Sequence, residues 1–364
     1  MRKHYVDNLR WFIILLLVPY HAAMAWNTWS EPNYIYFESN RLLSSIVVFL
    51  SPYFMPVLFL LAGMSTNFAL QKRTVGQYIS ERFKRLLIPF VFGTLLLTPV
   101  MTYIADIFNC GYDGSFFRHY RIFFTKFTDL TGADGGFSVG QFWFILYLFA
   151  ISVIAAGIIA VQKKIRSECK TDIPLWGICL LELPILFLSE LLSIGGKSLA
   201  EYLYIFLIGY YVFSKDRAVD KTEKYKYFFL CVGFISTVLN VYWFIWSGTE
   251  YPLLNTITKF VSEWFMLLAL LGIGKRHLNF SGRISKYLSQ RSFAFYILHY
   301  IWVVLFQYFM FRICGGSTVL LYVVPVFLAY GATFLCCEVC IRTPFLCYLM
   351  GIASKQEKYR KNIL

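Results

Sequence analysis

Long apolar stretches separated by short basic loops constrain this chain more than any other feature. Ten stretches reach or approach the roughly 20 residues that an α-helix needs to cross a bilayer. A spanning segment in lipid must satisfy its own backbone hydrogen bonds, so a helix is the structure that these stretches can adopt. We therefore predict an all-α polytopic membrane protein with about ten transmembrane helices. The predicted spans are residues 11–29, 44–70, 86–108, 139–161, 174–194, 199–213, 227–247, 254–273, 292–312 and 318–341.

Composition supports the membrane class. Hydrophobic residues make up 58% of the 364 residues and charged residues only 15%, which is too little charge for a surface in water. This excludes an ordinary soluble enzyme and a disordered protein. The net charge of +14 could indicate nucleic acid in a soluble protein. The sequence has no nucleic-acid-binding motif, however, so we expect no such partner.

The basic residues also predict the orientation of the chain. With the N-terminus in the cytoplasm, 27 of the 34 Lys and Arg residues lie in cytoplasmic segments and 7 on the other side. Cytoplasmic loops of membrane proteins carry such an excess. We predict that both termini are cytoplasmic. We expect one transmembrane domain over residues 1–352, followed by a basic cytoplasmic tail over residues 353–364.

The first span carries the most informative ionisable residues. Arg10 and His21 are 11 residues apart, which places them about 20° from the same helix face and roughly 16 Å apart along the axis. Arg10 would lie at the cytoplasmic mouth and His21 near mid-bilayer. Asp7 precedes Arg10 by one turn and could hold the guanidinium. A neutral imidazole can abstract a proton or accept an acyl group, although His21 could instead be a packed, hydrogen-bonded histidine.

A second basic feature is the pair Arg82 and Arg85, which share a face of a regular helix. The pair could be an anchor of the cytoplasmic side. Beside Arg10 it could instead bind phosphates, because guanidinium groups match phosphate oxygens. A phosphate-rich head in the cytoplasm and a reactive group deep in the membrane describe acyl-coenzyme A. Its thioester would lie near His21.

The sequence resembles acyltransferase family 3, the integral membrane acyltransferases, over nearly the whole chain. The resemblance is closest to the branch of osmoregulated periplasmic glucan succinyltransferases. The matching segments are Tyr5 to Arg10 with His21, Phe59 to Ser65 with Gly63, Arg82 to Pro89, Phe142 to Leu146, and Ser292 to His299.

The resemblance implies transfer of an acyl group from cytoplasmic acyl-CoA to a hydroxyl of a glycan, lipid or small molecule. It implies a catalytic role for His21, with Arg10 and Asp7 in support, and a bacterial inner or plasma membrane. The implied donor-binding residues, of which the last three could equally be packing residues, are Arg82, Arg85, Trp143, Tyr296 and His299.

Four acids lie within or beside predicted spans, and each could pair with a histidine or an arginine. They are Glu182, Glu190, Glu263 and Glu338. The loop 109–138 is polar and could be a lid or a substrate-recognition loop, with Arg118 and His119 expected at its solvated surface, although a glycan contact is open. We find no metal-ligand spacing and expect no metal.

Two further classes stay open. A proton-coupled transporter of an organic anion or glycan would use His21 and the acids as a proton relay. A non-catalytic partner of glycan export would not need His21. The acyl group, the acceptor, the oligomeric state and the choice between base and acyl carrier for His21 are left open by the sequence.

Overall fold

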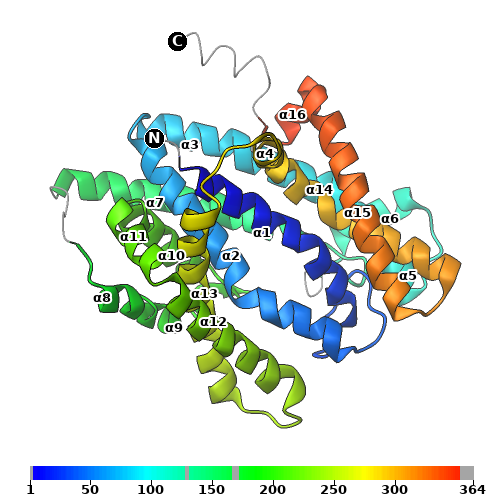
Figure 1. Cartoon of the computed structure of the whole chain (residues 1–364). Coiled ribbons are helices and arrows are strands. Elements are labelled where there is room, and N and C mark those ends of the chain that lie inside the picture. Colours follow the sequence, from blue (N-terminus) through cyan, green and yellow to red (C-terminus); the bar gives the residue numbers. More distant parts are fainter. Residues whose placement is uncertain (1–2, 128–130, 166–171, 353–364) are drawn as a thin grey trace. The chain divides into compact units, whose positions relative to one another are not determined.

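The computed structural model describes residues 3–127, 131–165 and 172–352, and these are almost entirely helical (Figure 1). Two strands of two residues each, β1 (Ser193–Ile194) and β2 (Lys197–Ser198), pair antiparallel in a short hairpin and are the strands recorded in the described residues. Within the same residues, eight helices are long and apolar enough to cross a membrane. The prediction of an all-α polytopic membrane protein is confirmed.

The eight long helical segments coincide with eight of the ten predicted spans, and several begin earlier than hydropathy alone suggested. The first begins at His4, so that Asp7 and Arg10 belong to the helix itself. The segments are His4–Trp26, Arg41–Leu70, Val75–Cys110, Gly140–Lys163, Lys226–Trp246, Pro252–His277, Arg283–Cys314 and Thr318–Arg342.

The other two predicted spans form the shorter apolar segments Leu175–Leu188 and Leu199–Phe213. A turn at Leu181 and Glu182 divides the first of these, and Pro184 follows it. Proline cannot donate a helical hydrogen bond, so it starts a new helix more readily than it continues one. Each segment is shorter than the roughly 20 residues that cross a bilayer unaided.

The chain divides into two compact units. Unit 1 comprises Met1–Ile13, Val48–Glu81 and Tyr147–Ser289, and unit 2 comprises Ile14–Val47, Arg82–Leu146 and Gln290–Leu364. The predicted basic tail, 353–364, lies outside the described residues.

The elements of unit 1, or shared by it, are α1 (His4–Ala23), α2 (Arg41–Leu70), α3 (Val75–Arg82), α7 (Trp143–Ile165), α8 (Leu175–Leu180), α9 (Leu183–Leu188), α10 (Leu199–Ile208), η5 (Gly209–Phe213), α11 (Asp216–Lys224), α12 (Lys226–Val241), η6 (Tyr242–Trp246) and α13 (Pro252–His277). Those of unit 2, or shared by it, are η1 (Met24–Trp26), η2 (Phe83–Leu87), α4 (Ile88–Phe92), η3 (Gly93–Leu97), α5 (Thr98–Cys110), α6 (Phe116–Thr125), η4 (Gly140–Phe142), α14 (Arg283–Cys314), α15 (Thr318–Arg342) and α16 (Pro344–Leu349).

In unit 1, α2 crosses the helix formed by α10 and η5 with backbones in contact. A Cβ atom added at Gly63 would lie 2.0 Å from the carbonyl oxygen of Phe206, and one added at Gly209 would lie 2.3 Å from that of Leu60. Small residues permit this approach in membranes, where packing rather than water exclusion joins helices. Gly63 is therefore a packing point between the two helices. Helices α12 and α13 lie side by side in the same unit (Figure 1).

In unit 2, Pro19 interrupts the backbone hydrogen bonds of α1 two residues before His21. Proline has no N–H to offer the carbonyl four residues earlier, which is that of Leu15. The hydroxyl of Tyr330 on α15 donates to this carbonyl at 2.6 Å, and Gln307 on α14 donates to the carbonyl of Ala22 at 2.9 Å. These bonds satisfy backbone groups that lipid could not, and so fix the end of α1 that carries His21.

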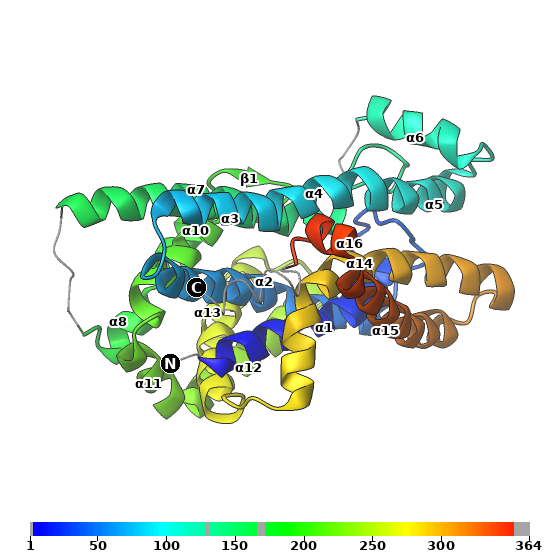
Figure 2. The same ribbon diagram turned by 90° about the horizontal axis from the view of Figure 1, so that it is seen from above.

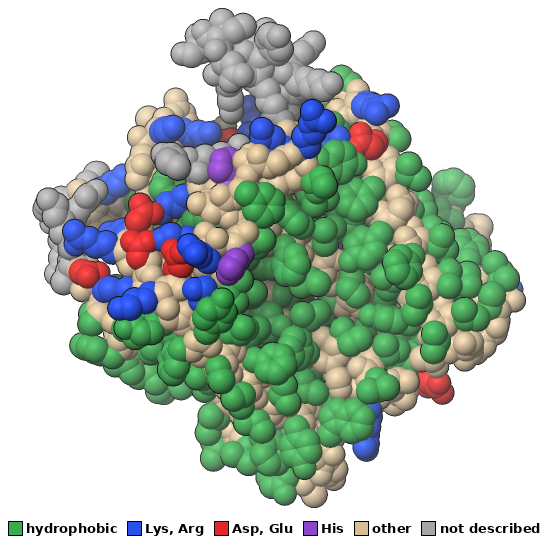
Figure 3. All heavy atoms as spheres, in the orientation of Figure 1, with side chains coloured by type: hydrophobic (Ala, Val, Ile, Leu, Met, Phe, Trp, Pro, Cys, Tyr) green, Lys and Arg blue, Asp and Glu red, His purple; other side chains and the backbone are tan. Residues whose placement is uncertain are grey.

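Helix α16, at the end of the described chain, lies against α4 (Figure 2). Side chains on the face shown in Figure 3 are mostly hydrophobic, and many large apolar residues of the long helices are exposed. An apolar surface of this extent suits lipid contact rather than water.

Candidate active site

In unit 1, the Arg10 guanidinium contacts an acid and a hydroxyl group. It forms an ion pair with Asp7 at 3.3 Å and donates a hydrogen bond to Oγ of Ser65 on α2 at 3.0 Å. Ser65 in turn donates to the carbonyl of Leu61 at 2.7 Å. The Arg10 side chain is 32% exposed, so the same group can also meet a ligand. The contact with Asp7 was expected from the spacing, whereas Ser65 was missed.

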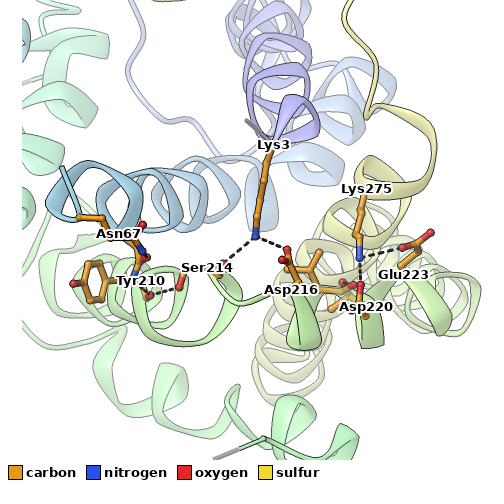
Figure 4. Close-up of polar contacts among 11 residues, drawn as sticks. Lys3, Asn67, Tyr210, Ser214, Asp216, Asp220, Glu223 and Lys275 are labelled. Atoms are coloured by element: carbon orange, nitrogen blue, oxygen red, sulfur yellow. Dashed lines mark hydrogen bonds and ion pairs between the residues drawn. The ribbon is translucent and has the colours of Figure 1, made fainter. Parts of the chain in front are cut away.

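The start of α1 is tied to α11 by charge (Figure 4). The Lys3 ammonium lies 2.8 Å from the Asp216 carboxylate and donates to the carbonyl of Ser214 at 2.9 Å. The hydrogen bond from Lys3 holds the pKa of Asp216 below its ordinary value. Lys275 at the end of α13 pairs with Asp220 of the same helix α11. These ion pairs link three elements of unit 1 at one end.

Asn8 fixes the turn between Asp7 and Arg10. Its amide nitrogen donates to the carbonyls of Leu278 at 2.6 Å and Phe280 at 2.9 Å, and its oxygen accepts from Ser285 at 2.6 Å. Asn8 is buried. Because each polar atom of this amide is engaged, the helix turn that carries Arg10 has a defined position in unit 1.

In unit 2, His21 lies among aromatic rings. Its ring stacks on that of Tyr300 with centroids 4.0 Å apart and planes at 21°. The ring of His299 lies 5.3 Å away, and that of Tyr20 meets His21 edge to face at 5.2 Å. His21 is half-buried, so this packing holds the ring while part of it stays accessible.

His299, from α14, is completely buried. Its Nδ1 lies 2.8 Å from the carbonyl oxygen of Tyr296, one turn earlier in the helix. Among the described residues, its Nε2 has no hydrogen-bond partner. A buried polar atom without a partner is costly, so such an atom beside a candidate catalytic residue calls for a chemical explanation.

Tyr296 and Trp143 occupy different settings. The hydroxyl of Tyr296 donates to the carbonyl of Gln141, and the Gln141 amide donates to the carbonyl of Ile297 at 3.4 Å. The ring of Tyr296 packs edge to face on Phe144 at 5.5 Å, and the ring of Trp143 meets Phe144 edge to face at 6.3 Å. Tyr296 thus joins α14 to the start of α7. Whether either residue binds a donor stays a prediction.

The segment after η1 buttresses the aromatic cluster. The hydroxyl of Tyr300 donates to Oδ1 of Asn33 at 2.6 Å, and the ring of Tyr34 lies 5.4 Å from that of Tyr300. The Tyr34 hydroxyl lies 3.2 Å from Oγ of Ser138. Burial raises the pKa of Tyr34 to about 12, so its hydroxyl stays protonated at neutral pH. Two loops therefore hold the residue on which His21 stacks.

Arg82 directly precedes a π-helical turn, Phe83–Leu87, and Arg85 lies within this turn, in one continuous helix. A π turn is wider than an α turn, so the two arginines diverge more around the axis than a regular i, i+3 pair. Gly351 lies against this turn, and a Cβ atom there would lie 2.7 Å from the carbonyl oxygen of Arg85. Such turns occur frequently at functional sites.

A family model described as an acyltransferase domain, that of acyltransferase family 3, matches residues 3–342. The chain belongs to this acyltransferase family. No curated protein and no solved structure matches it. The family resemblance is thereby confirmed, and the molecule is a multi-pass membrane acyltransferase.

The acids within or beside the apolar helices of the acyltransferase have different surroundings in the two units. In unit 2, Glu338 forms an ion pair with Arg291 at 2.5 Å and lies 3.8 Å from Arg342, so its partners are arginines. In unit 1, Glu263 is buried, and its Oε1 has no hydrogen-bond partner among the described residues. Glu201, an acid that sequence reasoning missed, is buried in the same unit. Glu190 is exposed.

The prediction that His119 lies on a solvated surface is wrong. His119 is completely buried, with Nε2 3.3 Å from the carboxylate of Asp106 and the rings of Tyr103 and Tyr112 each 5.3 Å away. Burial lowers the pKa of His119, and the Asp106 charge opposes this change. The loop folds into α6, and His119 anchors that helix to α5. Arg118 is exposed as expected.

In the part of the chain that the structure describes, no group of three His, Cys, Asp or Glu side chains could hold a metal ion.

Proposed function

We propose that this acyltransferase moves an acyl group from acyl-CoA to a hydroxyl of a carbohydrate or other acceptor on the far side of a bacterial inner membrane. Succinyl transfer to a periplasmic glucan is the specific form that the sequence resemblance favours. Family membership supports the transfer of an acyl group.

The setting of His21 carries the proposal. Its ring is half-buried, stacked on Tyr300 and next to a second histidine. A histidine packed only for stability would have no need of a second imidazole beside it with an unpartnered nitrogen. A neutral imidazole in this setting can act on a hydroxyl or a thioester.

Two reaction courses fit His21. As a general base, it removes the hydroxyl proton of the acceptor while the oxygen attacks the thioester carbonyl; the C–S bond breaks, and the thiolate of CoA takes the proton. As an acyl carrier, its unprotonated nitrogen attacks the thioester first, with release of the CoA thiolate, and then passes the acyl group to the hydroxyl. Both courses end with an ester and free CoA.

On the sequence resemblance alone, we assign binding of the phosphate-rich end of acyl-CoA to Arg10, Arg82 and Arg85. Arg10 is held by Asp7 and Ser65 and is 32% exposed. Guanidinium groups fixed in this way bind phosphate oxygens by two parallel hydrogen bonds. Along α1, the spacing of Arg10 and His21 gives the pantetheine arm roughly 16 Å to cover.

The test is acyl-CoA binding and turnover by the purified protein with a panel of short acyl-CoAs. The comparison is between the native chain, His21→Ala and Arg10→Ala, with His277→Ala as an exposed control. We expect His21→Ala to bind the donor without turnover and Arg10→Ala to bind it weakly. A native protein that neither binds nor consumes any acyl-CoA would overturn the proposal.

That negative result would favour the transporter alternative. The burial of the two acids Glu201 and Glu263 is the observation that a proton-coupled carrier would exploit. Uptake of an organic anion into vesicles without an acyl donor would then identify it.

A further inference from the structure

The protonation of His299 follows from its hydrogen bond. A carbonyl oxygen can only accept, so Nδ1 of His299 must carry the hydrogen that it shares with Tyr296. In a neutral imidazole the other nitrogen then holds a lone pair. The lone pair is on Nε2, which is buried and has no partner among the described residues.

His299 is also held rigidly. Its ring lies nearly parallel to that of Phe295, with centroids 6.2 Å apart and planes at 6°, and none of its surface is exposed. An acceptor in this position is therefore fixed in direction as well as in tautomer.

The distance between the imidazole rings of His21 and His299 decides whether a hydrogen bond can join them. Their centroids are 5.3 Å apart. Each imidazole nitrogen lies roughly 1.1 Å from its centroid, so facing nitrogens come within roughly 3 Å, which is hydrogen-bond length. The two rings are thus close enough for one hydrogen bond, which forms once a nitrogen of His21 is directed at the unpartnered Nε2 of His299.

We propose that His299 is a positioning residue for catalysis, and that its Nε2 accepts a hydrogen bond from the N–H of His21. The inference rests on the proposed function. The bond selects the tautomer of His21 in which the second nitrogen has the lone pair and faces the substrates. It also stabilises the imidazolium that forms when His21 removes the proton of the acceptor hydroxyl.

This role differs from that of a donor-binding residue. A residue that binds acyl-CoA changes KM, whereas a residue that orients the base changes kcat. The bond from the charged imidazolium of His21 to Nε2 of His299 stabilises the charged form, and the loss of such a bond slows turnover by about 10- to 100-fold.

The experiment compares His299→Phe and His299→Gln with the native protein. Phenylalanine keeps a flat ring but offers no acceptor, and glutamine can place its amide oxygen near the position of Nε2. His277→Phe is the matched control, because His277 is exposed at the end of α13. Steady-state kinetics with acyl-CoA give kcat and KM. Modification by diethyl pyrocarbonate, followed by peptide mass spectrometry, gives the reactivity of His21 without any turnover.

We expect His299→Phe to lower kcat by about 10- to 100-fold with KM for acyl-CoA unchanged, and His299→Gln to recover part of the loss. Modification of His21 should slow in His299→Phe, because its reactive nitrogen loses electron density, while modification of His277 keeps its rate. A purely structural role of His299 predicts the opposite, since loosened packing would expose His21 and speed its modification.

Native kcat and native His21 reactivity in His299→Phe would overturn the inference, as would faster modification of His21. Failure of the proposed function has a different signature, since the native protein would then lack turnover. The reactivity of His21 would still decide whether the two histidines are coupled.

Discussion

Replacing Gly63 by alanine has two opposite effects on the stability of the fold: alanine favours the helix, but its Cβ atom clashes with the backbone of a neighbouring helix. Alanine is favoured over glycine within a helix by about 1 kcal/mol. The new Cβ atom, however, would lie 2.0 Å from the carbonyl oxygen of Phe206, well inside the roughly 3.5 Å of an ordinary contact. Because the obstacle is the backbone of another helix, the two helices must separate.

Overpacking of this kind costs about 1–3 kcal/mol, and a backbone obstacle argues for the upper end. Subtracting the propensity gain leaves a net destabilisation of about 2 kcal/mol. For a unit of this size that corresponds to a fall of roughly 4–8 °C in the melting temperature. Gly157→Ala on α7 is the control, because nothing lies within 4 Å of its added Cβ atom. It should leave the melting temperature unchanged or raise it.

The same change should weaken donor binding. Ser65 lies two residues after Gly63 and accepts the hydrogen bond of Arg10, so a displaced α2 disturbs the guanidinium. The assay is thermal unfolding of the detergent-purified protein together with its Kd for acyl-CoA. If Gly63→Ala melts at or above the temperature of Gly157→Ala, the argument from backbone contact is refuted.

Two further predictions concern unit 2. Gly351→Ala should raise KM for acyl-CoA by about tenfold, because its Cβ atom would push on the backbone of Arg85. Gly315→Ala is the control, because Gly315 has the same left-handed conformation (φ 65° against 61° for Gly351) but an added Cβ atom there meets nothing within 4 Å. Steady-state kinetics of the two variants therefore separate the contact with Arg85 from backbone strain. Equal KM values for acyl-CoA in the two variants would contradict a role for that contact. Acidification should destabilise the anchor of α6. Because the pKa of His119 is lowered in the folded state, the unfolded chain takes up its proton first, and stability present above pH 6.5 is lost as the pH falls below it. Limited proteolysis of α6 at pH 7 and pH 5 checks this, and a cleavage rate independent of pH would count against it, with His119→Gln expected to abolish the dependence.

The membrane spans could be predicted because a helix that crosses the bilayer needs about 20 apolar residues, and the length of an apolar stretch is read directly from the sequence. Eight predicted spans have a long helix at the same place, and the division of the fifth at Glu182 depends on local turn geometry that hydropathy does not contain. The contact between Asp7 and Arg10 could be predicted for a similar reason, since one helical turn fixes it.

The surroundings of His21 could not be predicted in the same way. Tyr300 and Asn33 come from distant parts of the sequence, and nothing in their local pattern indicates that one binds the other. The burial of His119 did leave a signal, because Phe116, His119 and Phe123 follow helical spacing. His119 and Phe123 are buried, and the ring of Phe116 lies 5.5 Å from that of Tyr103 on α5. The polar composition of the loop 109–138 favours a solvated surface and conceals this signal in the sequence.

The π turn that follows Arg82 and contains Arg85 determines how the helix responds to a change of length. A π turn carries one residue more than an α turn, so deleting one residue from Phe83–Leu87 would let the helix close into regular α geometry. The helical segments before and after the turn would nearly keep their mutual orientation, because the deletion removes only the extra residue. The same deletion within a regular α-helix would rotate one part of the helix against the other by about 100°. A single-codon deletion at this turn is therefore a milder change for the flanking side chains than one in the α-helical turns beside it.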